Sequence, residues 1–81
     1  MAHTYLHRID PNANMARFYH IDLAPTLFGE VAVLRHWGRI GTNGRTTIET
    51  LPSINEAQQS ADRTLRQKSR RGYNPVDAKH G

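Results

Sequence analysis

The alternation of apolar and polar positions is most regular between residues 31 and 50. β-Branched, alternating stretches stand on both sides of residues 41–44, which read Gly-Thr-Asn-Gly. This pattern predicts two antiparallel strands joined by a short glycine-containing loop. Because successive side chains of a strand point to opposite faces, we expect Trp37 and Arg39 to share one face. Gly38 between them would leave the backbone uncovered.

The first part of the chain has the signals of two further strands. Residues 5–9 are a short strand-like segment, which we interpret as an edge strand or an extended arm. The turn-forming run at residues 10–14 closes this segment, and residues 15–23 alternate again as a strand. Residues 24–30 contain proline and glycine and predict a loop. The core candidates are Tyr19, Ile21 and Leu23 on the strand and Leu27 and Phe28 folding back from the loop.

A helix is predicted to begin after Ser53. The Ser53 hydroxyl can accept from the backbone of Glu56 while the Glu56 side chain reaches back to Ser53, as in a capping box. The helix is expected to end near Arg71, with Gly72 in a left-handed cap, and residues 74–81 are expected to be a tail. Its apolar positions repeat at three and four residues and are mostly small, which would let the helix lie close to a sheet. This stripe contains Ile54, Ala57, Ala61, Thr64 and Leu65.

These elements predict an α+β domain in which one helix packs across a twisted antiparallel sheet, with strands around Tyr19, Leu34 and Ile48. A chain of 81 residues fits one domain, residues 1–73 plus the tail, with a modest core and no deep enclosed active site. The absence of cysteine excludes disulfides and thiolate metal sites and suits a reducing compartment. No apolar run approaches a membrane span or a signal-peptide core, so we expect a cytoplasmic protein.

Candidate catalytic and metal-binding patterns are weak. The five histidines have no paired spacing on one helix and no acidic or thiol residue grouped with them, so no metal site is expected. No nucleophile and base pair is suggested, and the glycines match no phosphate-binding loop. We therefore expect a protein that is not an enzyme and needs no cofactor. The histidines are His3, His7, His20, His36 and His80.

The excess of basic residues indicates what kind of partner the chain binds. The chain has 11 Lys and Arg against 7 Asp and Glu, and the net charge of +4 favours polyanionic partners. A basic cluster near the helix end is open to two interpretations, a solvated end that complements the helix dipole, or, with Arg39 and Arg45, one continuous basic surface. Trp37 also has two interpretations, because it can be a core residue or a platform on which a base or sugar stacks. The cluster contains Arg63, Arg66, Lys68, Arg70 and Arg71.

The hairpin sequence of residues 37–41, Trp-Gly-Arg-Ile-Gly, followed by Gly44, resembles the signature of the WGR domain. This family is known from the DNA-dependent poly(ADP-ribose) polymerases and from many short bacterial proteins. The aromatic-pair strand at residues 17–23, the helix opening at residues 53–57 and the closing segment at residues 68–73 are also similar to it, in the same order. The resemblance covers residues 14–73 and implies the WGR-like fold.

The resemblance also implies roles for particular residues. In the polymerases the tryptophan at the position of Trp37 lies against a terminal ribose, the arginine at Arg39 lies by the strand, and the lysine at Lys68 approaches the DNA backbone. Ser69 stands where the family has threonine. Relatives that grip a 5′ phosphate tend to have asparagine where this chain has Ala16, so the sequence does not predict tight 5′-phosphate recognition, while general backbone binding is still expected.

Three functions follow from these observations. The first is a non-catalytic module for DNA ends or breaks, in which Trp37 stacks and basic residues neutralise phosphates without reading sequence, as in DNA-damage recognition. The second is a protein-interaction adaptor, because the domain also passes signals to its neighbours in the polymerases. The third is single-stranded DNA or RNA binding by the same surface. The residues predicted to bind nucleic acid are Trp37, Arg39, Arg45, Lys68, Arg70 and Arg71.

Overall fold

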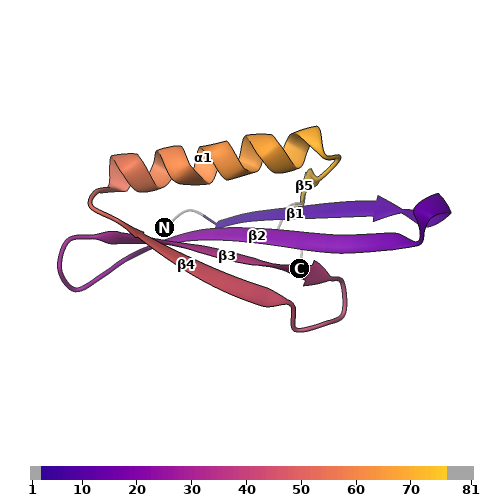
Figure 1. Ribbon diagram of the computed structural model, residues 1–81, viewed down its shortest axis with the longest axis horizontal. Coiled ribbons are helices and arrows are strands. Elements are labelled where there is room, and N and C mark those ends of the chain that lie inside the picture. The colour runs from indigo at the N-terminus through magenta and orange to yellow at the C-terminus, as the bar shows by residue number, and fades with distance from the viewer. Residues whose placement is uncertain (1–2, 77–81) are drawn as a thin grey trace.

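The computed structural model describes residues 3–76 and shows a five-stranded antiparallel sheet crossed on one face by a helix (Figure 1). The strand order is β4-β3-β2-β1-β5, so the first four strands pair with their neighbours along the chain. This arrangement confirms the predicted α+β fold. No helix among these residues is long and apolar enough to span a bilayer. The elements are β1 (His3–Asp10), η1 (Pro11–Ala13), β2 (Met15–Pro25), β3 (Val31–Arg39), β4 (Arg45–Leu51), α1 (Ile54–Arg70) and β5 (Asn74–Val76).

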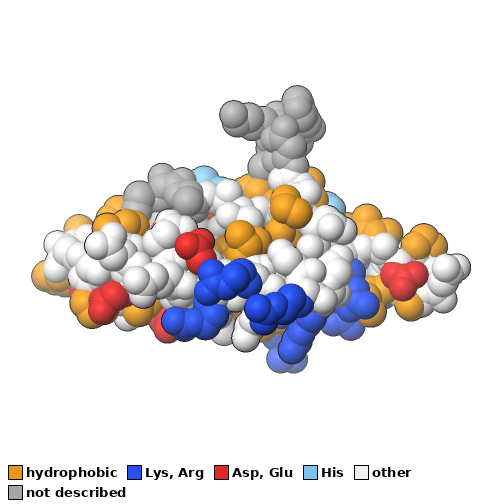
Figure 2. Space-filling model, turned by 90° about the horizontal axis from the view of Figure 1, so that it is seen from above, with side chains coloured by type: hydrophobic (Ala, Val, Ile, Leu, Met, Phe, Trp, Pro, Cys, Tyr) orange, Lys and Arg blue, Asp and Glu red, His pale blue; other side chains and the backbone are white. Residues whose placement is uncertain are grey.

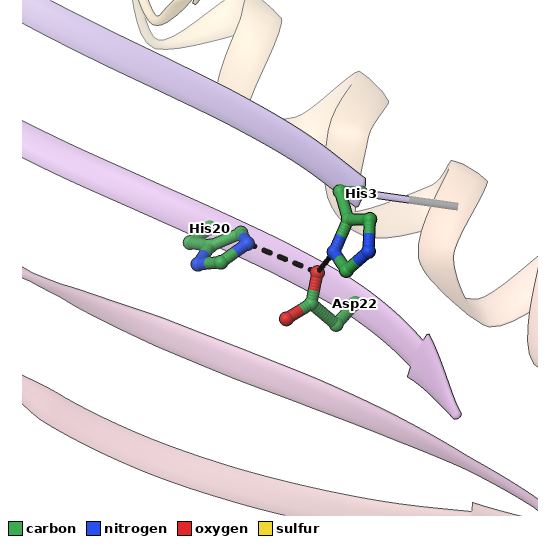
Figure 3. Close-up of side chains that lie close together, drawn as sticks. All are labelled: His3, His20 and Asp22. Atoms are coloured by element: carbon green, nitrogen blue, oxygen red, sulfur yellow. Dashed lines mark hydrogen bonds and ion pairs between the residues drawn. The ribbon is translucent and has the colours of Figure 1, made fainter. Parts of the chain in front are cut away.

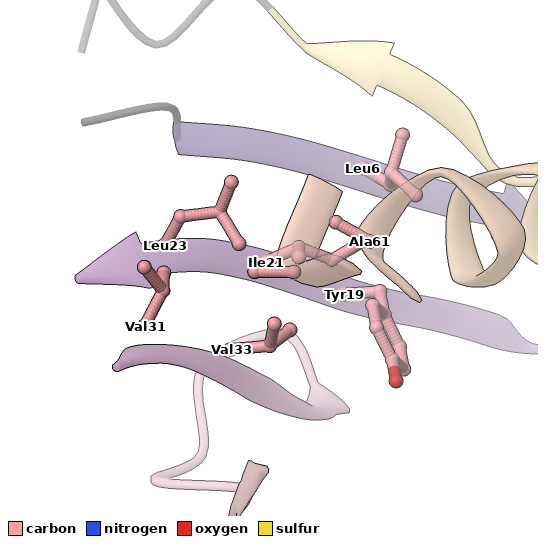
Figure 4. Packing of buried hydrophobic residues seen from close by; sticks show 8 residues of the cluster. Leu6, Tyr19, Ile21, Leu23, Val31, Val33 and Ala61 are labelled. Carbon is pink, nitrogen blue, oxygen red and sulfur yellow. The ribbon is translucent and has the colours of Figure 1, made fainter. Parts of the chain in front are cut away.

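The core lies between the sheet and α1 (Figure 4). The predicted face of β2 is buried as expected, and the adjacent strands β1 and β3 contribute to the same layer. The helix contributes two alanines, and these small side chains allow its backbone to approach the sheet closely. The buried apolar residues are Leu6, Tyr19, Ile21, Leu23, Val31, Val33, Ala57 and Ala61.

The sheet-facing side of α1 is more polar than the predicted stripe. Thr64 is buried as predicted, Ser60, which the predicted stripe did not include, is buried as well, and Ile54 of the stripe is 47% exposed. The reason lies on β3, where Arg35 points to the same face as the core residues. Its Nε donates to Thr64 Oγ1 at 3.0 Å and its Nη2 donates to Ser60 Oγ at 2.7 Å. The buried hydroxyls therefore satisfy a partly buried guanidinium.

Both ends of α1 are capped close to where the sequence predicts. Ser53 Oγ accepts the N–H of Glu56 at 3.3 Å. The Glu56 carboxylate accepts from the Ser53 hydroxyl at 3.5 Å, not from the backbone N–H that a capping box would use. At the other end Gly72 has φ +93° and the N–H of Tyr73 donates to the carbonyl of Lys68, as in a Schellman motif.

β1 is an interior strand, which corrects the prediction of an edge strand or arm. It pairs with β2 from His3 to Asp10 and with β5 on its other side. The turn at Gly72 reverses the chain after α1 and brings residues 74–76 back to β1 as a strand, where the sequence predicts a tail. Residues 77–81 of the predicted tail lie outside the described residues.

The turn between β2 and β3 is exposed, so the expectation that Leu27 and Phe28 pack on the core is wrong. Leu27 is 95% and Phe28 86% exposed. The turn is closed locally, because the N–H of Thr26 donates to the carbonyl of Glu30 at 2.9 Å. It lies at one end of the sheet, beyond the first turn of α1, where no helix surface is available (Figure 1).

The face of the sheet opposite α1 is called the open face, because no described helix or strand covers it (Figure 1). Its side chains alternate along each strand with those of the core. Many are aromatic or histidine, which is unusual for a face left to solvent. They include His3, Tyr5, His7, Phe18, His20, Asp22, Leu34, His36 and Ile48.

Candidate nucleic-acid interface

Trp37 lies near the end of β3, on the face that α1 covers, and is paired with Tyr19 of β2. The two rings are stacked, with centroids 5.8 Å apart and 15° between their planes. Trp37 is only half-buried, and it packs against the core cluster from outside. The ring is therefore both a packing residue and an accessible aromatic surface, so neither of the two sequence interpretations describes it alone.

Lys68, from the last turns of α1, lies over the rings of Tyr19 and Tyr73. Its Nζ is 4.7 Å from the centroid of the Tyr19 ring and 5.7 Å from that of Tyr73. Burial, and then the charge of Arg71, lower the pKa of the Lys68 ammonium, while the ring faces favour its charged form. A phosphate beside it would favour the charged form further. Tyr19 thus joins the basic end of α1 to Trp37.

A hollow opens beside Trp37 where β2, β3 and β4 present arginines. The strand register places Arg17 opposite Arg39, and Arg45 opposite Trp37. Like charges directly opposite on antiparallel strands are destabilising. None of these three arginines forms an ion pair with another residue in the described part of the chain. The hollow is lined by Arg17, Trp37, Gly38, Arg39, Gly44 and Arg45, without an acidic side chain.

Positive charge is concentrated on one side of the helix-bearing surface, where Figure 2 shows most of the visible Lys and Arg side chains together. Of the six residues predicted to bind nucleic acid, three line the hollow and Lys68 is connected to it through the rings. Arg71 caps α1 and lies close enough to Lys68 to affect its charge. Arg70 is exposed, and no described contact links it to the hollow. The three in the hollow are Trp37, Arg39 and Arg45.

Arg17 is the lining residue that sequence reasoning missed. It precedes the aromatic pair of β2 and, by alternation, shares the face of Tyr19. That signal was present in the sequence, but alternation alone does not say which residue lies on the neighbouring strand. The antiparallel register of β2 and β3 puts Arg39 there. A pair of opposed arginines is the result.

Arg35 shares the helix-side face but has a structural role. Besides its bonds to Ser60 and Thr64, its Nη2 donates to Glu49 Oε1 at 3.2 Å. Ser60 Oγ also donates to Glu49 Oε1, at 2.7 Å. The hydrogen bond from Ser60, and then the bond and charge of Arg35, lower the pKa of the Glu49 carboxyl. This network ties α1 to β3 and β4 and leaves Arg35 neutralised.

The glycines of the hairpin are required by close backbone packing. A Cβ at Gly38 would lie 2.7 Å from Gly44 Cα, and a Cβ at Gly44 would lie 2.3 Å from the Trp37 carbonyl oxygen. The loop therefore covers Gly38 on the open face, whereas on the face of Trp37 and Arg39 Gly38 belongs to the lining of the hollow. On the open face, the His36 ring donates to the carbonyl of Asn43 and holds the loop in place.

Comparisons with known proteins identify relatives of the chain. The profile of the WGR domain matches residues 2–80. The "Uncharacterized protein y4dW" of Sinorhizobium fredii (strain NBRC 101917 / NGR234) is 44% identical over 71 residues, which are 88% of this chain and 35% of that protein. A crystal structure of a protein from Bacteroides fragilis has a TM-score of 0.80 at 23% identity, over 96% of this chain and 20% of that one, and shows the same fold. The chain thus spans a minor part of both relatives.

Proposed function

Because the chain belongs to the WGR domain family, we propose that it is a module that binds DNA ends or breaks without reading their sequence. WGR is a non-catalytic domain family, and membership is consistent with nucleic-acid binding. In this proposal Trp37 stacks on the sugar or base of a terminal nucleotide. Arg39 and Arg45 contact phosphates beside it, and Lys68, Arg70 and Arg71 extend the positive surface along the strand.

The observation that carries the proposal is the hollow around Trp37. Three arginines without ion-pair partners among the described residues surround a half-exposed aromatic ring. Arg17 and Arg39 face each other across two strands, an arrangement that costs stability unless an anion lies between them. A guanidinium is suited to phosphate because its planar fork can donate two hydrogen bonds at once. An aromatic ring next to such forks matches the alternation of base and phosphate in a nucleic-acid strand.

The number of basic residues at the hollow sets the expected electrostatic contribution to DNA binding. Three arginines in the hollow and the nearby Lys68 and Arg71 provide roughly three to five phosphate contacts, which predicts a slope of about −3 to −4.5 for log K against log salt on duplex DNA. The accessible aromatic surface is a single ring, so stacking is limited to about one nucleotide. A stacking site of this size favours a strand terminus or a nick over continuous duplex, where the bases are stacked on each other.

The test is a fluorescence-anisotropy titration of labelled DNA at two salt concentrations, about 50 and about 200 mM. Nicked and blunt-ended duplexes should bind more tightly than a closed hairpin duplex of the same length, with the slope given above. Because Ala16 offers no side-chain amide, a 5′-phosphorylated and an unphosphorylated end should bind alike. Equal binding to closed and broken duplexes, or a salt-independent affinity, would contradict the proposal. Tighter binding to single-stranded DNA or RNA would favour that alternative instead.

Variants of the hollow separate specific contacts from general charge. Arg39→Lys keeps the charge but lacks the planar fork, so it should weaken binding to ends. Arg17→Ala should weaken it as well and reduce the salt slope by about 1. The matched control is Arg66→Ala, because Arg66 is exposed and about half a turn away from the sheet-facing residues of α1. If all three variants lose affinity equally, the hollow has no special role.

A protein-interaction adaptor is the second candidate, and one observation favours it. Leu27 and Phe28 are an exposed apolar pair on the β2–β3 turn, far more exposed than such residues usually are. The chain also corresponds to only part of the longer relatives, in which other segments accompany it. Binding through that turn would be weakly salt-dependent and would be lost in Phe28→Ser. DNA binding through the hollow would be unaffected by the same change.

A further inference from the structure

Three potential metal ligands form a cluster (Figure 3), which lies on the open face of the sheet. It contains His3 from the start of β1 and His20 and Asp22 from β2. The sequence predicts no metal site; His20 and Asp22 are two residues apart, but His3 is far from both along the chain. The register of the sheet brings them together, since His3 is paired with Asp22 and His20 stands two residues earlier on the same face.

The ligand atoms of the cluster converge on one point. Each residue offers one ligand atom, and all three atoms lie within 4.8 Å of one another. His3 Nδ1 is in hydrogen-bond contact with Asp22 Oδ1, and His20 Nε2 lies 3.0 Å from the same oxygen. In Figure 3 both imidazole rings point at the carboxylate between them. Two imidazoles and one carboxylate are a donor set that zinc proteins use.

His20 has the least accessible ligand atom of the cluster. Its Nε2 is buried and faces the Asp22 carboxylate oxygen at 3.0 Å, in a contact that does not have hydrogen-bond geometry. Its ring is held in place by Tyr5, which stacks on it with centroids 4.0 Å apart and 23° between the planes. A buried ring nitrogen whose contact lacks hydrogen-bond geometry is poorly satisfied, which costs stability. A cation bound to that nitrogen would remove the cost and would use the orientation that Tyr5 already imposes.

We propose that His3 Nδ1, His20 Nε2 and an Asp22 carboxylate oxygen bind one Zn²⁺ ion. A tetrahedral zinc ion with bonds of about 2.0 to 2.1 Å separates its ligand atoms by about 3.4 Å, so rotations of the exposed His3 and the partly exposed Asp22 side chains suffice to fit it. Three protein ligands leave the fourth position to water. Mg²⁺ prefers an octahedral set of oxygen ligands and does not suit two imidazoles.

The site joins His3, the first residue of β1, to His20 and Asp22 in the second half of β2. Zinc bound there stabilises the folded state by mass action, because the unfolded chain does not hold the three ligands together. The ligands alternate along β2 with the core residues Tyr19 and Ile21, so the site and the hollow lie on opposite faces. The proposal is therefore independent of nucleic-acid binding, and each can fail without the other.

The experiment is a calorimetric titration of the untagged chain with ZnCl₂, and with MgCl₂ as the contrasting cation. We expect one zinc per chain, a melting temperature that rises with zinc concentration, and no response to magnesium. His3→Gln and Asp22→Asn should each weaken zinc binding at least tenfold and abolish the rise in melting temperature. The matched control is His7→Gln, because His7 lies on the same face of β1 outside the cluster and should leave both unchanged.

Imidazole ¹⁵N NMR of the parent chain gives a readout that does not depend on any variant folding. Zinc should shift His3 Nδ1 and His20 Nε2 and leave the ring nitrogens of His7 and His36 unaffected. The proposal is overturned if zinc shifts neither nitrogen, if His3→Gln and Asp22→Asn bind zinc like the parent, or if His7→Gln weakens binding as much as they do. The last result would mean that zinc binds surface histidines at random.

Discussion

Replacing Trp37 by alanine separates the packing role of this ring from its proposed role in binding. A fully buried large aromatic costs about 3 to 5 kcal/mol when truncated to alanine. Trp37 is half-buried at the margin of the core, so we expect the unfolding free energy to fall by about 2 kcal/mol, of which the stack on Tyr19 accounts for roughly 0.5 to 1.5 kcal/mol. The domain should therefore remain folded at room temperature.

The effect on DNA binding should be of similar size and arise separately. Loss of one stacked aromatic weakens single-strand binding by about 1 to 3 kcal/mol, which is about 5-fold to 150-fold in Kd. The salt slope should stay the same, because the arginines of the hollow are retained. Trp37→Phe keeps a flat ring and should recover most of both losses. Phe28→Ala removes an aromatic that is 86% exposed on the far turn and should change neither.

Two measurements check this prediction. Chemical denaturation followed by circular dichroism gives stability without relying on tryptophan fluorescence, because Trp37 is the only tryptophan of the chain. Anisotropy titration with a nicked duplex gives affinity under conditions where each variant is folded. In the parent chain, quenching of the single tryptophan on adding DNA reports stacking directly. The reasoning is refuted if Trp37→Ala loses more than about 3 kcal/mol of stability yet binds the nicked duplex as tightly as the parent.

Three further predictions concern the packing that supports this site. Gly44→Ala should lower stability by more than about 2 kcal/mol and impair DNA binding, because φ is +68° and its Cβ would lie 2.3 Å from the Trp37 carbonyl; an unchanged melt would show that the loop relaxes freely. The pKa of Glu49 is lower in the folded chain than its ordinary value of 4.5, so the ionised carboxylate stabilises the fold at pH values above 4.5. This stability is lost as the pH falls through the lowered pKa; acid melts should show the loss in the parent and not in Glu49→Gln. Ser53→Ala should cost about 1 kcal/mol in thermal melts while leaving DNA affinity unchanged, and no effect would mean that the cap contributes nothing.

Local signals were enough to predict several elements from the sequence. Ser53 begins the helix and Gly72 ends it because a serine side chain and a left-handed glycine satisfy helix-terminal groups through bonds a few residues away. The alternation in residues 15–23 identified the buried face of β2, because that pattern needs no knowledge of the partner strand. The same logic placed Trp37 and Arg39 on one face, together with the resemblance to the WGR signature.

Features that depend on partners far along the chain were not predictable in this way. Leu27 and Phe28 are exposed because α1 does not extend over their turn. The pairing of β1 with β5 depends on where the chain returns after α1. Alternation could place Arg17 on a face but not opposite Arg39. Nor could it place His3 beside Asp22.

The sequence by itself therefore determined the helix with its caps, the strands other than β5 and the faces of these strands, because these depend on backbone preferences and on spacing within a few residues. Only the tertiary structure decided which side chains meet, because strand register is set by the packing of the whole sheet. The hollow at Arg17 and Arg39 and the histidine cluster at His3 and His20 both come from that register.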